Sequence, residues 1–309
     1  MPRIVPIPRR LVGTAFLTSN AAGHSLTRGR LRGADVAHPF HGVSCVDLDL
    51  ASILGLCRAY EPRLGPGEVF SHTTAAAVLG VPLPESIAVA PLHVSSRGSA
   101  SRPRSRAVVG HRLTLGDVAI CGDLPVTDPA TTWCHLAVFL SREDLVAAGD
   151  FLVSGRRLPG GSRTEPLASI AMLEAAVRRF RGGRGVTKLA WAVTRIRFGV
   201  DSRPESHTRL LLVAAGIPEP RVNFATPVDG GRRILHADLT LEEWRVLFDY
   251  EGDGHRTDAR TFRNDIERRE LFEAAGWRHI RVTADNVFVR PGQFTDRVKG
   301  ILRERGWRG

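Results

Sequence analysis

Three carboxylates in one short stretch, Asp238, Asp249 and Glu251, are the side chains of this sequence best spaced to do chemistry. Residues 233–239 and 244–252 each read as a β-strand, joined by a short polar loop. Because strand side chains alternate between two faces, Asp249 and Glu251 project from one face, and a hairpin brings Asp238 to the same face. Crowded carboxylates repel one another and lose hydration, and a divalent cation relieves both penalties. We therefore predict that Asp238 and Asp249 bind Mg²⁺ or Mn²⁺.

The chemistry that such a site supports is phosphodiester hydrolysis, because a bound metal polarises a phosphate oxygen and acidifies a water. His255 follows a tight turn just past the acids and is a candidate general base; a turn histidine bonded to the backbone is the equal alternative. Glu251 is a further ligand or holds a water. Glu205 stands three residues after Ser202, where a capping box is the favoured role and a place in the site is compatible with it.

The elements that must position these acids can be read from their boundaries. A helix is predicted to open at Ser202 and to close at Gly216, upstream of the two strands. A second helix is predicted from Thr257 or Asp258 to Ala275, ended by Gly276, and is followed by a strand over residues 278–282.

Residues 202–306, about a third of the chain, resemble the very-short-patch-repair-like endonuclease domain of the restriction-endonuclease-like superfamily. The resemblance rests on the order and spacing of short motifs, namely Pro204-Glu205-Ser206, Ala214-Ala-Gly216-Ile-Pro218, Ala237-Asp238-Leu239, Asp249-Tyr-Glu251-Gly252, His255, Asp265, Arg268-Arg269 and Gly276-Trp277. It implies a mixed sheet flanked by helices and a metal-dependent endonuclease site. The order Asp249 then Glu251 differs from the more usual Glu then Asp, and Glu251 stands where lysine is often found.

The N-terminal part resembles the degenerate winged-helix region of abortive-infection-type antitoxins, through residues 21–46 and 125–136. Helices are predicted over residues 47–60 and 71–80, and Asp128 is predicted to cap a further helix. Two short strands, beginning at Leu92 and Val108, flank an arginine-rich loop. Histidines 72, 93, 111 and 135 lie on separate predicted elements, and their spacing gives no metal-ligand pattern.

Positive charge is concentrated outside the acidic stretch. The formal net charge is +11, and the excess lies in residues 1–200. Such stretches suit a phosphate backbone, although arginine is also this chain's general basic residue, and a charge run is usually a solvated face. The candidate nucleic-acid-binding residues are Arg102, Arg104, Arg106, Arg178, Arg179, Arg181 and Arg184. The expected partner is double-stranded DNA.

The sequence predicts a mixed α/β (α+β) protein with three parts. These are an antitoxin-like, winged-helix-like region over residues 1–155, a basic helical linker over 156–200, with helices at 164–180 and 186–198, and a restriction-endonuclease-like domain over 201–309. Cys45, Cys57, Cys121 and Cys134 have no Cys-x-x-Cys spacing, which favours buried free thiols over zinc or a disulfide framework.

Two functions follow from these patterns. The first is a metal-dependent DNA endonuclease that acts in defence, repair or mobile-element biology; the alternative is an antitoxin-like or transcriptional regulator with an inactive nuclease fold. Retained acids favour the first, because an inactive site has no need of crowded carboxylates. No apolar run approaches the length of a membrane span, and the N-terminus lacks a signal peptide's apolar segment. We therefore expect a cytoplasmic protein with no membrane partner.

Overall fold

The computed structural model describes residues 6–87, 91–98, 102–103, 105–113, 116–158, 161–251 and 259–309. The predicted site residue His255 and the predicted DNA-binding residue Arg104 lie outside the described residues. The chain divides into two compact units. The first unit contains residues 1–140 and 171–189, and the second contains residues 141–170 and 190–309. The predicted domain boundaries at residues 155 and 200 stay predictions.

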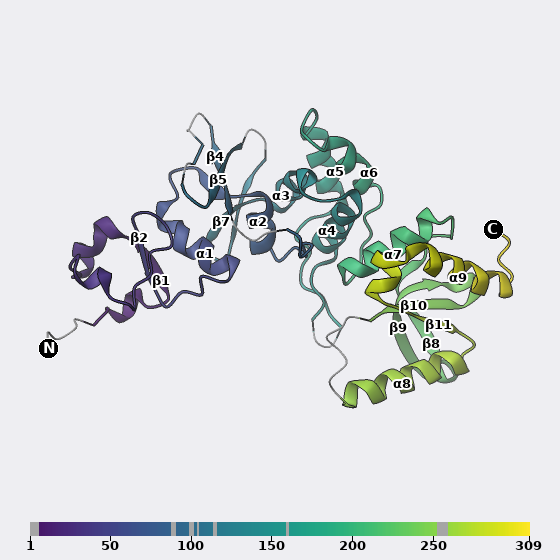
Figure 1. Ribbon diagram of the computed structural model, residues 1–309. Helices are drawn as coiled ribbons and strands as arrows, with labels where there is room; N and C mark the ends of the chain where they lie inside the picture. Colours follow the sequence, from purple (N-terminus) through teal and green to yellow (C-terminus); the bar gives the residue numbers. More distant parts are fainter. Residues whose placement is uncertain are drawn as a thin grey trace. The chain divides into compact units, whose positions relative to one another are not determined.

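The fold is mixed α/β, as predicted, and the first unit holds two sheets (Figure 1). In the smaller sheet, β1 (Thr14–Leu17) pairs antiparallel with β2 (Val43–Val46). The larger sheet has the order β5-β4-β3-β7-β6. Its strands are β3 (Glu68–Phe70), β4 (Leu92–Arg97), β5 (Val108–Leu113), β6 (Val118–Cys121) and β7 (Leu124–Thr127). The β4–β5 and β3–β7 pairs are parallel, and β3–β4 and β6–β7 are antiparallel.

Helices and short helical turns complete the first unit and the neighbouring segments. The helices are α1 (Ile53–Tyr60), α2 (His72–Val78), α3 (Pro129–His135), α5 (Ile170–Arg179) and α6 (Val186–Val193). Short 3-10 turns cover Arg9–Leu11, Thr18–His24, Arg30–Arg32, Glu61–Arg63 and Leu136–Val138 in this unit, and Asp229–Gly231 and Glu242–Trp244 in the second. Asp128 caps α3 as predicted, because its carboxylate accepts hydrogen bonds from the amides of Ala130 and Thr131 at 3.1 Å each.

Three predicted helices are shorter than expected. The helix predicted from Asp47 begins at Ile53, because Asp47 has a positive φ of 53° and Ser52 caps the helix through the amide of Gly55. The helix predicted from Thr164 begins at Ile170, because the backbone before it bonds to the carbonyl of Leu152 instead. The helix predicted to reach residue 198 ends at Val193.

The second unit is built on one four-stranded sheet of order β11-β10-β9-β8. Its strands are β8 (Arg221–Val228), β9 (Arg233–Leu241), β10 (Val246–Tyr250) and β11 (Arg278–Val282). The β8–β9 and β9–β10 pairs are antiparallel and β10–β11 is parallel, so the predicted hairpin and final strand are confirmed. The helices are α4 (Arg142–Ser154), α7 (Arg203–Ala214), α8 (Ala259–Ala274) and α9 (Pro291–Glu304), with a π-helical turn at Asp285–Val289.

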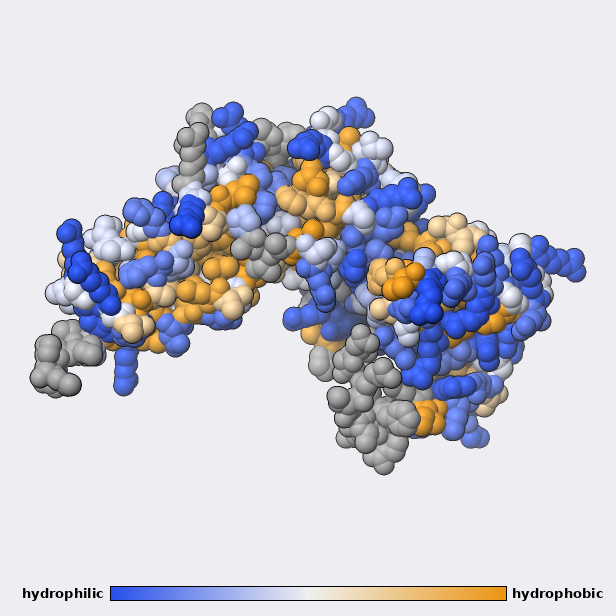
Figure 2. Space-filling view, in the orientation of Figure 1, coloured by the Kyte–Doolittle hydropathy of each residue, from blue (hydrophilic) through white to orange (hydrophobic). Residues whose placement is uncertain are grey.

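Helices cover both faces of this sheet (Figure 1). On one face, Leu212 of α7 and Val298 of α9 pack in the same buried cluster as Phe248 of β10. On the other face, Phe272 of α8 packs with Leu247. Leu247 and Phe248 are neighbours in β10, so the alternation of a strand supplies both layers. The outer side of α9 lies in a largely hydrophilic part of the visible surface (Figure 2), as expected of an amphipathic helix.

The cysteines are packing groups. All four are free, and Cys45, Cys57 and Cys134 are buried. Burial raises the pKa of the Cys57 and Cys134 thiols to about 12, which keeps them protonated and poorly nucleophilic. Among the described helices, none is long and apolar enough to cross a membrane.

Candidate functional site

The two predicted metal ligands face each other where two strands part. Asp238 lies on β9 and Asp249 on β10, but the backbone ladder between these strands ends one position earlier, at Leu239 and Phe248. At the next position the side chains make the cross-strand bonds. An Asp249 Oδ1 oxygen accepts from the Asp238 amide at 3.1 Å, and an Asp238 Oδ2 oxygen accepts from the Tyr250 amide at 2.7 Å. The carboxylates therefore bridge the opening between the strands.

The carboxylate of Asp249 is surrounded by donors. Arg268 of α8 donates from Nε and Nη2 to Oδ2, at 3.2 and 3.0 Å. The Nε2 atom of His279, on β11, lies 3.1 Å from the same oxygen. Burial by itself raises the pKa of Asp249, but the hydrogen bond from His279 and the charge of Arg268 outweigh it and lower the pKa below its usual range. Asp249 is therefore ionised and charge-compensated.

Asp238 and Glu205 behave in the opposite way. Burial, followed by repulsion from Asp249, raises the pKa of Asp238 to about 7, although the Tyr250 amide and Arg268 oppose the rise. Burial, followed by repulsion from Asp238, raises the pKa of Glu205 to about 8. The three acids thus hold protons to different extents at neutral pH, which is the pattern of groups that exchange protons at a reactive site.

The backbone around Ser202 positions Glu205. Ser202 Oγ accepts from the Glu205 amide at 3.3 Å, which confirms half of the predicted capping box. The Glu205 side chain bonds to the amide of Asp201, at 3.0 Å, one residue beyond the expected partner. Glu205 is only 7% exposed, so one side chain both caps α7 and contributes to the buried acidic cluster.

Helix α4 fixes α7 through buried polar pairs. Asp144 accepts from Arg203 Nε, and the Nε2 atom of His207 bonds to the same Oδ1 oxygen, both at 2.7 Å. Further along α4, Asp150 accepts from Ser206 at 2.7 Å and from Arg209 at 3.3 Å. These contacts hold the helix that presents Glu205.

Glu251 lies at the edge of this cluster. Its carboxylate forms an ion pair with Arg281 of β11, and its amide donates to Val282 at 2.8 Å. Arg281 is the backbone partner of Asp249, so the ion pair lies on the same side of the sheet as Asp249. Sequence reasoning gave no role to His279 or Arg268, because only the β10–β11 register and the packing of α8 bring them to Asp249.

Four histidines whose spacing in the sequence gives no metal-ligand pattern meet in the structure. His72, His93, His111 and His135 lie on separate elements, as predicted, yet pairing of β4 with β5 and the packing of α2 and α3 bring them together. Their separations in sequence gave no signal, because every ligand comes from a different element. Among the described residues, His72, His93 and His111 form the set of three or more ligand-type side chains whose donor atoms fall within 4.8 Å of one another; the acids form no such set.

The candidate DNA-binding arginines all belong to the first unit, whereas the acids belong to the second. The six that the structure describes are exposed, and these are Arg102, Arg106, Arg178, Arg179, Arg181 and Arg184. Arg179 lies 3.6 Å from Asp117 and Arg178 lies 4.0 Å from Glu174, which are weak, solvated pairs. Their guanidinium groups are therefore accessible to a polyanion.

No family model matches this chain. Two uncharacterized proteins of Mycobacterium tuberculosis, from strains CDC 1551 / Oshkosh and ATCC 25618 / H37Rv, are each 26% identical to it over 248 residues. The match covers 80% of this chain and 85% of each relative. It is longer than either compact unit, so it includes residues of both.

Proposed function

We propose that this chain is a metal-dependent DNA endonuclease, with a restriction-endonuclease-like, very-short-patch-repair-like second unit and an antitoxin-like, winged-helix-like region before it. The observation that carries the proposal is the pair of half-buried carboxylates, Asp238 and Asp249, that cross between β9 and β10 where the backbone ladder stops. The flanking order of α7, hairpin, α8 and β11 supports it, because it matches the order expected from the sequence motifs.

The donor set fits a hard divalent cation. Asp238 and Asp249 offer carboxylate oxygens, which Mg²⁺ and Mn²⁺ prefer. Asp249 is ionised beside the positive charge of Arg268, and Asp238 has a pKa of about 7, so it can deprotonate for a ligand role near neutral pH. When bound, the ion would polarise a phosphate oxygen and acidify a water.

The chain's own groups have distinct tasks in this reaction. Arg268 and His279 orient the Asp249 carboxylate, and Tyr250 orients that of Asp238 through its amide. Glu205, with a pKa of about 8, is the acid that retains a proton at neutral pH and can exchange it with water or with a leaving oxygen. The exposed arginines of the first unit supply sequence-independent attraction for duplex DNA.

The test is direct. Purified protein is incubated with supercoiled, linear, mismatched and single-stranded DNA, with Mg²⁺, with Mn²⁺ and with EDTA. We expect nicking or cleavage with the divalent ions only. Glu243→Gln removes an exposed acid from the same hairpin and serves as the matched control, which should cleave like the wild type. A wild-type protein that cleaves none of these substrates with either ion would refute the proposal.

That negative result would favour a regulator that binds nucleic acid through an inactive fold. One observation favours this second function. In the described residues the charges of Asp249 and Glu251 are already met by Arg268 and Arg281, an arrangement that is stable without a metal. A regulator would bind DNA with steep salt dependence and without any need for a divalent ion.

A further inference from the structure

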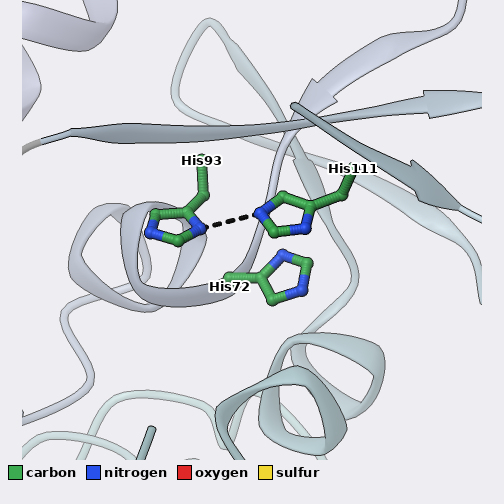
Figure 3. A group of neighbouring side chains, drawn as sticks. All are labelled: His72, His93 and His111. Atoms are coloured by element: carbon green, nitrogen blue, oxygen red, sulfur yellow. Dashed lines mark hydrogen bonds between the residues drawn. The ribbon is translucent and has the colours of Figure 1, made fainter. Parts of the chain in front are cut away.

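Four histidines of the first unit gather at one place although they come from four elements. His72 is the first residue of α2, His93 lies on β4, His111 on β5, and His135 is the last residue of α3. One ring nitrogen from each of His72, His93 and His111 lies within 4.8 Å of the other two. Figure 3 shows the three rings turned toward a common space beneath the strands.

The rings approach one another as closely as ligands of one ion. The Nδ1 atom of His93 lies 2.8 Å from Nε2 of His111 (Figure 3). The ring of His72 stacks on the ring of His111, with centroids 3.8 Å apart. It also stacks on the ring of His135, with centroids 4.2 Å apart. Tetrahedral zinc with Zn–N bonds of about 2.0–2.1 Å places its donor atoms roughly 3.3 Å apart, so small shifts would satisfy it.

The four histidine rings have the protonation state that a metal ligand requires. Burial lowers the pKa of each of the four imidazoles, and the histidines repel one another when charged. The pKa of His111 and of His135 falls to about 4. All four rings are therefore neutral at pH 7, which is the form of histidine that binds metal.

Neighbouring groups hold the rings in place. The Nδ1 atom of His72 lies 2.9 Å from Ser71 Oγ, which in turn accepts from Ser95 Oγ at 2.8 Å. Such second partners orient a ligating imidazole. His72 also has a φ of 54°, an uncommon conformation for a residue other than glycine, which is found where surroundings impose it. Phe139 packs its edge against the rings of His72 and His93.

We propose that His72, His93 and His111 form a binding site for a divalent transition metal such as Zn²⁺, with a fourth position filled by His135 or by water. Nitrogen ligands suit zinc and its neighbours, whereas Mg²⁺ prefers oxygen, so this site differs in chemistry from the acidic cluster. The Nδ1 atom of His135 is buried, and among the described residues it has no hydrogen-bond partner, which makes His135 available as a ligand.

The bound ion would act as a cross-link. It would tie the start of α2 to β4 and β5, elements that are distant in sequence, and would stabilise the folded unit by binding it in preference to the unfolded chain. Arg102 opposes this binding, because its positive charge acts on His111, where it also lowers the pKa.

The experiment uses the full chain without a polyhistidine tag, stripped of metal with a chelator and then titrated with Zn²⁺. We expect one tightly bound equivalent and an increase in the thermal midpoint. His93→Gln and His111→Gln should each weaken binding at least about 10–100-fold, the loss typical of even an outer-shell change. Arg102→Gln should tighten it. His41→Gln removes an exposed histidine of the same unit and should leave binding unchanged.

X-ray absorption of the zinc-loaded wild type keeps the test valid where a variant fails to fold. Three or four imidazole nitrogens at about 2.0–2.1 Å support the site, whereas sulfur or mainly oxygen coordination overturns it. His135→Gln distinguishes the two fourth ligands, since a change from four to three imidazoles identifies His135 and an unchanged three identifies water. Wild-type affinity in both ligand variants, or no zinc bound by the wild type, would refute the proposal. None of these outcomes bears on DNA cleavage.

Discussion

The two units each bury a cluster of titratable groups, and they neutralise it differently. In the first unit the four histidines lose their protons, because burial lowers the pKa of an imidazole and its neutral form carries no charge. In the second unit burial neutralises two of the three carboxyl groups, and the third keeps its charge. Asp249 remains ionised beside Arg268 and His279, whereas Asp238 and Glu205 retain protons up to a pH of about 7 and about 8.

The contrast shows that burial changes the charge of bases and of acids near pH 7, and with it the kind of metal ion that each can bind. Buried bases become uncharged nitrogen donors, which attract a borderline-soft metal without needing counter-charge. Buried acids near one another need protons, arginine or a hard cation, and the balance among these three changes with pH. Substitutions in the two clusters and in the contacts around them test this difference.

Asp249→Asn should reduce metal-dependent DNA cleavage at least about 10³-fold, because asparagine keeps the size of the side chain but not the charge that holds the cation. DNA binding should be retained or improved, since it runs through arginine–phosphate contacts. Initial cleavage rates and a binding titration on one DNA measure both effects. Cleavage by this variant at the wild-type rate would place the reaction elsewhere in the chain.

Arg209→Met should lower the free energy of unfolding by about 3–5 kcal/mol, because it leaves the Asp150 carboxylate buried without its cation. Both side chains are 1% exposed. Urea unfolding measures the change. The double variant Asp150→Asn, Arg209→Met should recover part of the loss, since it removes the unpaired charge. A loss below 1 kcal/mol in the single variant would show that this acid does not depend on its partner.

Asp238→Asn should stabilise the protein more at pH 8 than at pH 5, by about 1–3 kcal/mol. The folded-state pKa of about 7 exceeds the unfolded value of 3.8, so the native carboxyl holds a proton that the unfolded chain releases. Wild-type stability should therefore fall as pH rises from about 4 to 7. Urea unfolding in EDTA at the two pH values measures it. An equal effect at both pH values would show that the pKa of Asp238 is not raised in the folded protein.

Asp144 provides the control of opposite sign. Burial raises its pKa, but hydrogen bonds from His207, Arg203 and Ser141 together lower it below the usual range. Its ionised form therefore stabilises the fold above pH 3.8, and that contribution is lost as pH falls below this value. Asp144→Asn should destabilise the protein at both pH 8 and pH 5, unlike Asp238→Asn.

His135→Gln should change the free energy of unfolding by only about 1 kcal/mol in EDTA at pH 8, because it replaces one neutral polar group by another. The folded-state pKa of His135, about 4, lies below the unfolded value of 6.5, so the variant should be relatively more stable at pH 6, where the unfolded wild type takes up a proton. Thermal or urea unfolding measures the effect. A loss of stability as large as that expected for Arg209→Met would show that His135 is not simply a neutral buried group.

Local patterns predicted much of the second unit. Alternation identified β9 and β10, and Ser202 and Gly216 marked the limits of α7, because caps and strand periodicity depend on residues within a few positions. The same reasoning failed at Ile53 and Ile170, where a positive φ or a distant carbonyl ends the helix. These causes are contacts and conformations that neighbouring residue types do not specify.

Short-range spacing along the chain is enough to predict the mixed α/β class, the hairpin that carries Asp238 and Asp249, and the cap on α7. Which groups surround those acids, and that four separated histidines meet, follows from the folded arrangement instead. Both depend on strand register and on helix packing, as when β4 pairs with β5 to bring His93 to His111. Register and packing are fixed by burial of the whole core, so the pKa values and metal preferences that follow from them are properties of the folded chain.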